Sequence, residues 1–413
     1  MSIVGIVAEY NPLHGGHLYH IEESRRLAQA DGVICVMSGN FTQRGEPAIV
    51  DKWARAEMAL QAGADLVFEI PVTFAARSAY FFALGSVLML QKTGVVTHIS
   101  FGSELGDISP LQELASLLAD EPPKLQALIK NRLKQGVSYP TARAQAVLEH
   151  LNNSQIAKEH DLKSLLSSPN NILAMEYLRI INHKQCTLIP VTVPRKGSGY
   201  YEPGNTEFPS ATYIRSQIAA GTPVDQLIGL PSSTRQILSR EFAKGSGPVT
   251  QTQLTELALF MLKRLSSSEL AQIYDVTEGL ENTFKKAGAT SNSLDELFEK
   301  VKSKRYNRTR LNRILLYVLI NLTKQICEDF DSSGPPYLRL LGFSPCGQKI
   351  LQKMKTKSEL PVITKTGSLR GPRYSDWKLK SMLAFDVLAS DLYSILTGHC
   401  ISGIDYSQQP VSI

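Results

Sequence analysis

The amino-acid sequence predicts an α/β protein, with a doubly wound parallel sheet followed by a mainly helical C-terminal domain. Over the first hundred residues, short apolar runs bounded by Gly or Pro alternate with segments of helical periodicity, as in parallel sheets with crossover helices. A Gly/Ser/Pro stretch at 244–248 then precedes a part with mainly helical periodicity. The 413 residues suffice for two or three domains. We expect domains at 1–243 and 249–413, with a helical insertion at about 108–165.

Each element follows from its local pattern. The apolar run at 3–7 is typical of a buried parallel strand, and a helical pattern takes over from Gly16. Further strands are expected at 33–37, 66–70, 98–101 and 186–193, and helices at 52–61, 79–90, from 168 onward and at 210–219. Ligands of such a Rossmann-like sheet bind at the carboxyl ends of the strands. In the C-terminal part, the apolar stripe at 311–322 predicts a helix packed on a core.

Composition places the chain among ordinary globular proteins. Hydrophobic residues make up 43% and charged residues 20% of it. No apolar run reaches the length of about 18 residues that a membrane-spanning helix needs. The five cysteines are scattered without CxxC spacing, which indicates reduced thiols and no zinc site. Because a strand begins at residue 3, no room remains for a signal peptide, and we expect a cytoplasmic protein.

The turn between the first strand and the first helix contains two histidines, His14 and His17. A helix N-terminus presents free N–H groups and the positive end of the dipole, so it binds phosphate well. Imidazoles three residues apart share one face of the first turn. Metal ligands, or ordinary polar residues at a helix start, would explain the same pair, but the preceding strand and the Asn-Pro turn favour phosphate. The arrangement resembles the HIGH-type signature of nucleotidyltransferases and class I aminoacyl-tRNA synthetases.

Further polar residues follow the other strands of the predicted sheet. Asn40 and Arg44 lie in the loop after the second strand, and Gly102 follows the fourth, although a plain connection or turn would explain each. Asn170 lies at a helix start that Ser-Pro capping explains, but its amide is not needed for capping and can contact an adenine or ribose edge. The helix after the second strand begins with two more cations, Lys52 and Arg55. Each of them, taken alone, is best explained as a solvated charge.

Arg195 follows the last strand, so its guanidinium is expected at the same edge of the sheet, where it could hold triphosphate oxygens. The segment from Ser210 through Thr212 to Arg215 resembles the second phosphate motif of nucleotidyltransferases, although a capping serine and a surface arginine would look the same. Attack on an α-phosphate needs positioning and charge neutralisation more than a covalent nucleophile. The residues therefore predict adenylyl transfer.

Basic segments distinguish the C-terminal part. Around Tyr306, six cations occur in twelve residues without an acid among them: Lys302, Lys304, Arg305, Arg308, Arg310 and Arg313. Further basic segments lie at 349–357 and 370–380. A charge run is usually a solvated face, but several such segments, with a net charge of +6, favour contacts with RNA phosphates. Solubility or an acidic partner are the alternatives.

The order of these motifs resembles that of the bacterial tRNA(Met) cytidine acetate ligase family. The resemblance extends from residue 3 to about residue 393, and it rests on the segments 5–17, 37–47, 63–67, 168–177, 210–215 and 304–313. The family usually has Phe and Asn where this chain has Leu13 and Gly15, while both histidines are present.

The resemblance implies a HIGH-type nucleotidyltransferase fold and an ATP-dependent ligase. In this family, ATP and acetate form acetyl-adenylate and pyrophosphate, and the acetyl group passes to the wobble cytidine of elongator tRNA(Met), giving N4-acetylcytidine and AMP. His14 and His17 would stabilise the α- and β-phosphates, and Arg215 would hold pyrophosphate. A Mg²⁺ ion is expected with ATP, and no membrane partner is.

The implied site residues fall into two sets. The ATP-binding set is Val7, Ala8, Glu9, Tyr10, Asn11, Pro12, Leu13, His14, Gly15, Gly16, His17, Leu18, Tyr19, His20, Gly102, Asn170, Arg195, Ser210, Thr212 and Arg215. The substrate- and RNA-binding set is Asn40, Arg44, Lys304, Arg305, Arg308, Arg310 and Arg313.

Two other functions compete with this one. A small-molecule adenylyltransferase of a cofactor pathway would share the two histidines but needs no basic C-terminal half. A non-catalytic RNA-binding protein with a relict nucleotide fold would lose no activity when His14 or His17 is changed.

Overall fold

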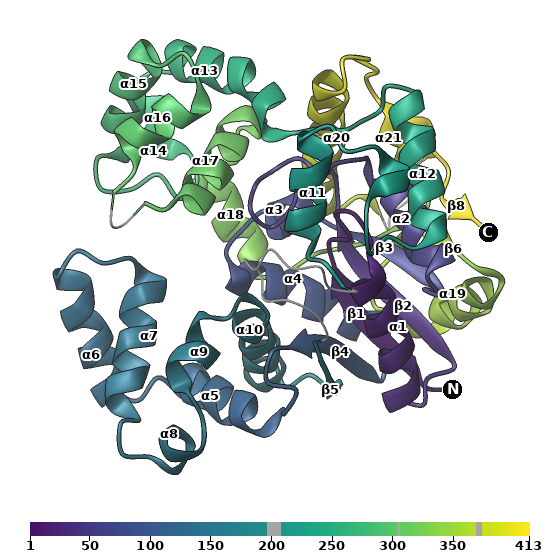
Figure 1. Ribbon diagram of the computed structural model, residues 1–413, viewed down its shortest axis with the longest axis horizontal. Coiled ribbons are helices and arrows are strands. Elements are labelled where there is room, and N and C mark those ends of the chain that lie inside the picture. Colours follow the sequence, from purple (N-terminus) through teal and green to yellow (C-terminus); the bar gives the residue numbers. More distant parts are fainter. Residues whose placement is uncertain (196–207, 304–305, 369–373) are drawn as a thin grey trace.

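The computed structural model describes residues 1–195, 208–303, 306–368 and 374–413. In this part of the chain, one twisted sheet has helices on both faces, and a separate group of helices lies beside it (Figure 1). The strands follow the order β5-β4-β1-β2-β3-β6-β7, with β8 paired to β6. Their bounds are β1 Ile3–Ala8, β2 Gly32–Ser38, β3 Leu66–Ile70, β4 His98–Ser103, β5 Ile189–Pro194, β6 Leu338–Phe343, β7 Val362–Ile363 and β8 Val411–Ser412.

The doubly wound parallel sheet expected from the sequence is confirmed. Strands β1 to β5 pair in parallel with one another. The sequence pattern did not predict β6, which pairs antiparallel with β3, nor β7 and β8, which pair with β6. The C-terminal half therefore completes the sheet. A short, mostly apolar run among helices, here interrupted by Arg339, resembles a buried helix segment as much as a strand, so periodicity alone does not reveal β6.

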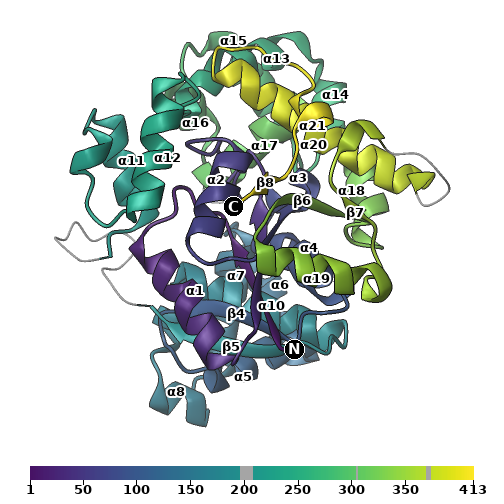
Figure 2. The same ribbon diagram turned by 90° about the vertical axis from the view of Figure 1, so that its right-hand side faces the viewer.

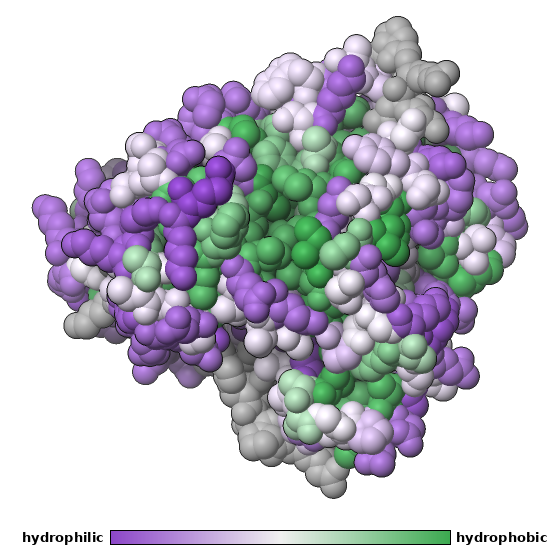
Figure 3. Space-filling view, turned by 90° about the horizontal axis from the view of Figure 1, so that it is seen from above, coloured by the Kyte–Doolittle hydropathy of each residue, from purple (hydrophilic) through white to green (hydrophobic). Residues whose placement is uncertain are grey.

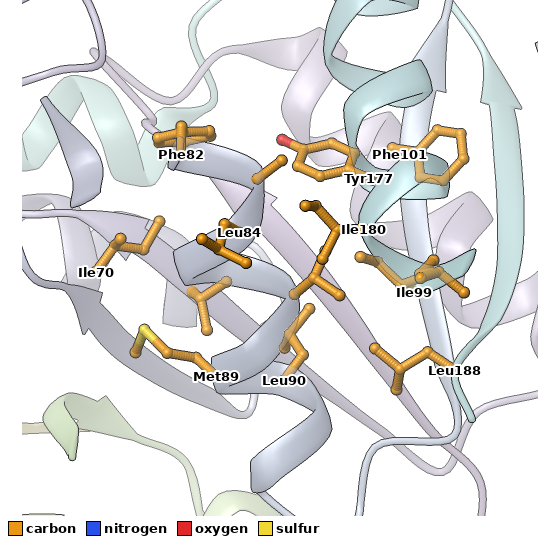
Figure 4. Close-up of a cluster of buried hydrophobic side chains, with 14 of the residues drawn as sticks. Ile70, Phe82, Leu84, Met89, Leu90, Ile99, Phe101, Tyr177, Ile180 and Leu188 are labelled. Atoms are coloured by element: carbon orange, nitrogen blue, oxygen red, sulfur yellow. The ribbon is translucent and has the colours of Figure 1, made fainter. Parts of the chain in front are cut away.

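Successive side chains of each strand point to opposite faces of the sheet, and helices pack on both faces. On β2, Val33 and Cys35 pack into one core with α1 and α2, while Ile34 and Val36 pack into the other with α4 and α10. Figure 4 shows part of the second core, where side chains of α4, α10 and the strands interlock. The helices of the sheet region are α1 Gly15–Leu27, α2 Lys52–Gln61, α3 Val72–Ala75, α4 Ala79–Lys92, α10 Pro169–His183, α11 Ala211–Ala219, α12 Ser232–Ala243 and α19 Pro345–Lys357.

Two further groups of helices extend from the sheet. The expected insertion forms a helical cluster at the lower left of Figure 1: α5 Ser109–Asp120, α6 Pro123–Lys134, α7 Tyr139–His150, α8 Gln155–Glu159 and α9 Leu162–Ser167. A third core holds the C-terminal bundle together. Its helices are α13 Thr255–Arg264, α14 Ser267–Gln272, α15 Leu280–Thr290, α16 Leu294–Val301, α17 Arg308–Ile320 and α18 Lys324–Asp331, with α20 Trp377–Leu396 connecting it to the sheet (Figure 2) and α21 Ile404–Ser407 following.

The surface seen from above is mixed in character. Apolar side chains gather in its middle, bordered by hydrophilic ones (Figure 3). Across the described residues, none of the helices combines the length and the apolar character that crossing a membrane would require.

Candidate active site

A cavity of about 410 Å³ opens where the strands of the sheet end. It is lined by the carboxyl ends of β1, β4 and β5 and by the first turns of α1, α4, α10 and α11. Most residues of the predicted ATP-binding set line it: Val7, Ala8, Glu9, Tyr10, Asn11, His14, Gly16, His17, Tyr19, His20, Gly102, Asn170, Arg195, Ser210, Thr212 and Arg215. The remaining four predicted residues are not part of its lining: Pro12, Leu13, Gly15 and Leu18.

The two histidines are fixed by the backbone of the turn that carries them. His14 caps α1, because its Nδ1 accepts the N–H of Gly16 at 3.1 Å. The Nδ1 of His17 accepts the N–H of His14 at 3.3 Å, and the two rings stack with centroids 3.8 Å apart. Since each Nδ1 accepts a hydrogen bond, the proton of each neutral ring is on Nε2. Each ring therefore has an Nε2–H donor for a ligand.

Both imidazoles are neutral at ordinary pH. Burial, together with the charges of Arg195 and Arg215, lowers the pKa of His14 to about 3. Burial also lowers the pKa of His17 well below its usual value, with a further contribution from His14. The two rings therefore act as hydrogen-bond donors, and the positive charge of the site comes from its arginines.

Arg215, on α11, bonds to the turn that contains the two histidines. Its guanidinium donates to the carbonyl oxygen of Asn11 at 2.7 Å and to Oγ1 of Thr212 at 3.3 Å. Ser210 caps α11 by accepting the N–H of Tyr213. The predicted second phosphate motif is thus a helix N-terminus with a fixed guanidinium, joined directly to the histidine turn.

Arg195 and Asn170 approach the cavity from β5 and α10. A side chain at Gly102 would lie 3.5 Å from the Cγ of Arg195, so the two residues are neighbours. The Asn170 amide donates to the carboxylate of Glu104 at 2.6 Å, and Glu104 also accepts the backbone N–H of Asn171. The carboxylate of Glu104 ties the loop after β4 to the start of α10, which fixes this side of the cavity.

The interpretation of Lys52 and Arg55 as solvated charges is wrong. Both side chains are fully buried. Lys52 forms ion pairs with Glu69 at 2.7 Å and with Asp405, from the far end of the chain, at 2.9 Å. Arg55 donates to the backbone carbonyls of residues 9, 38, 39 and 50, so it holds the ends of β1 and β2 together. Most of their partners are remote in sequence, such as Asp405 for Lys52 and Glu9 for Arg55, which is why local reasoning missed their burial.

The loop after β2 connects the cavity to the basic helix α17. Arg44 lines the cavity, whereas Asn40 is buried outside it and bonds to the backbone N–H of Lys52. Gly45 has a φ of +75°, and a Cβ there would lie 2.6 Å from the Cα of Arg313. Only glycine allows this close approach.

Two of the predicted RNA-binding cations pair with acidic residues from other segments of the chain. Arg308 pairs with Asp295 and Arg310 with Asp275, at 2.7 and 2.8 Å. Arg313 lies on the same helix, α17. The RNA role of these residues stays a prediction. Four cations of the predicted basic segments lie outside the described residues: Lys304, Arg305, Arg370 and Arg373.

The lining residues that sequence reasoning did not assign to the site include Ala79, Phe82, Tyr177 and Phe208. Three of them are apolar and carry no motif. For Tyr177 the sequence contains a weak indication of a place in the site. It follows Asn170 by two helical turns and therefore shares its face of α10. Among the described residues, no three His, Cys, Asp or Glu side chains group in a way that could hold a metal ion.

Comparisons with known proteins agree with this geometry. A family model described as HIGH Nucleotidyl Transferase matches residues 1–405. The chain is 44% identical to a tRNA(Met) cytidine acetate ligase from Syntrophomonas wolfei, covering 100% of this chain and 99% of that protein. It is 41% identical to the protein of that name from a Thermoanaerobacter strain, covering 98% of each.

Solved structures match as well. The apo structure of Thermotoga maritima TmcAL superposes with a TM-score of 0.93, at 34% identity, over the whole of both chains. The structure of the same protein bound to alpha-thio ATP gives a TM-score of 0.90, at 34% identity, covering 100% of this chain and 99% of that one.

Proposed function

The chain belongs to the tRNA(Met) cytidine acetate ligases of the HIGH nucleotidyl transferase family, and on this premise we propose how its site works. The enzyme uses ATP to activate acetate and transfers the acetyl group to the wobble cytidine of elongator tRNA(Met). The observation that carries this function is the meeting, in one cavity, of the histidine turn, the α11 N-terminus and Arg215. Relatives under this name match over the full length of the chain.

In the first step, an acetate oxygen attacks the α-phosphorus of ATP. A P–O bond forms to the acetate, and the bond to the bridging oxygen of the β-phosphate breaks, so pyrophosphate leaves with the electron pair. His14 and His17 donate their Nε2–H groups to phosphate oxygens as negative charge develops. Arg215 and the N–H groups at the start of α11 hold the leaving pyrophosphate.

In the second step, the N4 amine of the cytidine attacks the carbonyl carbon of acetyl-adenylate. A C–N bond forms, AMP leaves with the electrons of the broken C–O bond, and N4 loses a proton. We propose that α17 and its neighbouring basic segments bind the tRNA backbone, and that the loop containing Arg44 lies between this surface and the cavity. Loop bases of RNA are already unpaired and can enter a pocket without opening a duplex.

The described residues of the cavity do not fit a magnesium ion held by the protein. Glu9 and Glu46 line it, but the described chain offers no group of three ligands, and burial raises the pKa of Glu9. We propose that any Mg²⁺ is held by the ATP phosphates. We also propose a cytoplasmic location, which fits the free thiol state of the cysteines in the described chain.

One assay tests the proposed function. Pyrophosphate release is measured with ATP and acetate, with ATP and small phosphorylated acceptors, and with ATP, acetate and total tRNA. We expect release that depends on acetate, and N4-acetylcytidine in the tRNA digest. Release that ignores acetate but responds to a small acceptor would instead identify a cofactor-pathway adenylyltransferase, and no release at all would favour a non-catalytic RNA-binding protein.

A further inference from the structure

One end of the cavity is not taken up by the nucleotide motifs. Phe82, Tyr177 and Phe101 all line the cavity, and they lie in a row at one edge of the buried cluster (Figure 4). Phe101 directly precedes Gly102, which belongs to the predicted ATP-binding set, and its ring is 5.8 Å from that of Tyr177. Phe82, on α4, is at the opposite end of the row. The Phe82 end of the row therefore lies away from Gly102.

The hydroxyl of Tyr177 is a donor that lacks a protein partner. Tyr177 is only 4% exposed, and its oxygen points toward Phe82 (Figure 4). Among the described residues, none forms a hydrogen bond with this hydroxyl, although the side chain lines the cavity. Burial raises the pKa of Tyr177, so the group keeps its proton. Because a buried hydroxyl without a partner is costly, the hydroxyl is suited to an acceptor on a bound ligand.

The wall around this hydroxyl is apolar and small. Phe82 is 2% exposed, and Ala79 lies one turn before it on the same face of α4. The first turn of α4 faces the cavity with the positive end of a 14-residue helix. Ser78, at the N-cap, makes no side-chain hydrogen bond to this turn. Gln43 holds the adjacent loop against this helix start by donating to the carbonyl of Arg77 at 2.7 Å.

Glu9 is the charged group that acts on Tyr177, and Arg44 is close enough to Glu9 to lower the pKa of its carboxyl. Arg44 and Glu9 both line the cavity, and the N–H of Gln43 donates to the Glu9 carboxylate at 2.6 Å. Burial raises the pKa of Glu9, and the positive charges of Arg215, Arg44 and Arg55 around it offset its negative charge. A short apolar group with one carboxylate fits this combination of apolar wall, hydroxyl donor and positive charge.

We propose that Tyr177, Phe82 and Ala79 form the subsite for acetate. The methyl group packs against Phe82 and Ala79, and one carboxylate oxygen accepts the hydrogen bond of Tyr177. The other oxygen is the nucleophile that attacks the α-phosphorus. This assignment rests on the proposed function, and it makes Tyr177 a substrate-binding residue and Phe82 a residue that limits the size of the acid.

Tyr177→Phe tests the hydrogen bond. In acetate-dependent exchange of labelled pyrophosphate into ATP, we expect the KM for acetate to rise at least about tenfold, since hydrogen bonds to charged groups are strong, while the KM for ATP stays the same. The matched control is Tyr139→Phe, which removes the hydroxyl of an exposed tyrosine in the insertion. An unchanged KM for acetate would overturn the assignment, as would an equal rise in the KM for ATP.

Two variants at the wall test the size limit. Phe82→Ala is expected to raise the kcat/KM for propionate and butyrate relative to acetate, by about fourfold for each added methylene. Ala79→Val is expected to raise the KM for acetate and to leave the KM for ATP unchanged. Ala79 is half-buried, so this position tolerates a larger side chain better than the core does. Unchanged selectivity in Phe82→Ala together with an unchanged KM for acetate in Ala79→Val would refute the subsite.

The same data separate the subsite from the proposed function. Wild-type exchange that does not depend on acetate would refute the proposed function and, with it, the subsite. Acetate-dependent exchange in the wild type, combined with wild-type KM values for carboxylic acids in all three variants, would refute the subsite alone.

Discussion

His17 combines two roles in one imidazole. Its Nδ1 accepts the N–H of His14 and so orders the turn, and its other nitrogen is left to donate to a phosphate. Because the ring is neutral, the catalytic contribution that we propose for it is a hydrogen bond that strengthens as the α-phosphate gains charge.

His17→Ala is therefore expected to lower the rate of acetyl-adenylate formation by about 10²–10³-fold, the usual effect of removing one donor to a developing anion. The affinity for tRNA, measured by filter binding, should stay close to that of the wild type. His17→Asn is the control for the turn, since an Asn oxygen can still accept a backbone N–H. Equal losses of adenylation and tRNA binding would indicate that His17 is only structural.

The low pKa of His14 predicts how stability depends on pH. The unfolded histidine takes up a proton below about pH 6.5, whereas the folded one does so only at about 3. Unfolding is thus favoured progressively as the pH falls through this window.

His14→Asn should remove the share of this dependence that comes from His14, because Asn also caps helices but does not titrate. The buried His17 and His20, whose pKa values are also lowered, keep their own shares. Between pH 7 and pH 5, urea unfolding should show that the wild type loses more stability than the variant, by on the order of 2 kcal/mol. The same slope in both proteins would mean that another group controls acid unfolding in this range.

At the scale of elements, helix α2 is anchored by charges from distant parts of the chain. Lys52, at its first turn, is completely buried between Glu69 of β3 and Asp405 of α21. Removing one partner of a buried pair leaves an uncompensated charge, which costs far more than breaking an exposed pair.

Asp405→Asn is accordingly expected to lower the free energy of unfolding by about 3–5 kcal/mol. The comparison is Asp295→Asn, which breaks the exposed pair with Arg308 and should cost less than about 1 kcal/mol. Denaturant titration of both variants provides the measurement. Similar small losses would show that the Lys52 network does not hold the end of the chain to the sheet.

At the scale of the whole molecule, the C-terminal half contributes both to the sheet and to the surface beside the cavity. Strand β6 pairs with β3, and α17 packs against the loop that contains Arg44 and Gly45. The predicted tRNA surface and the adenylation site are therefore adjacent parts of one body.

Neutralising three cations of α17 together tests that surface. Changing Arg308, Arg310 and Arg313 to Gln should weaken tRNA binding. It should also flatten the dependence of this binding on salt, since fewer counterions are released. Pyrophosphate exchange without tRNA should persist. Because Arg308 and Arg310 also pair with Asp295 and Asp275, thermal unfolding of the variant is the necessary control. Unchanged affinity and salt slope would place the tRNA elsewhere.

Much of the sheet region could be predicted because its signals are local. The boundaries of β3 and α2 match those expected, since an apolar run stopped by Pro71 and an amphipathic helix are each visible within a short window. Strand β5 begins at Ile189, three residues later than expected, because apolar character alone does not show where pairing with β4 starts.

The sequence by itself determined the parallel sheet, the histidine turn at its edge and the second phosphate motif. Each depends on periodicity, caps or turn residues within a dozen positions, and these act locally. Only the tertiary structure decided that Lys52 is buried, that β6 joins the sheet and that Phe82 and Tyr177 line the same cavity. Lys52 and Asp405 lie 353 positions apart, and burial depends on which distant surfaces pack together, which no short window contains.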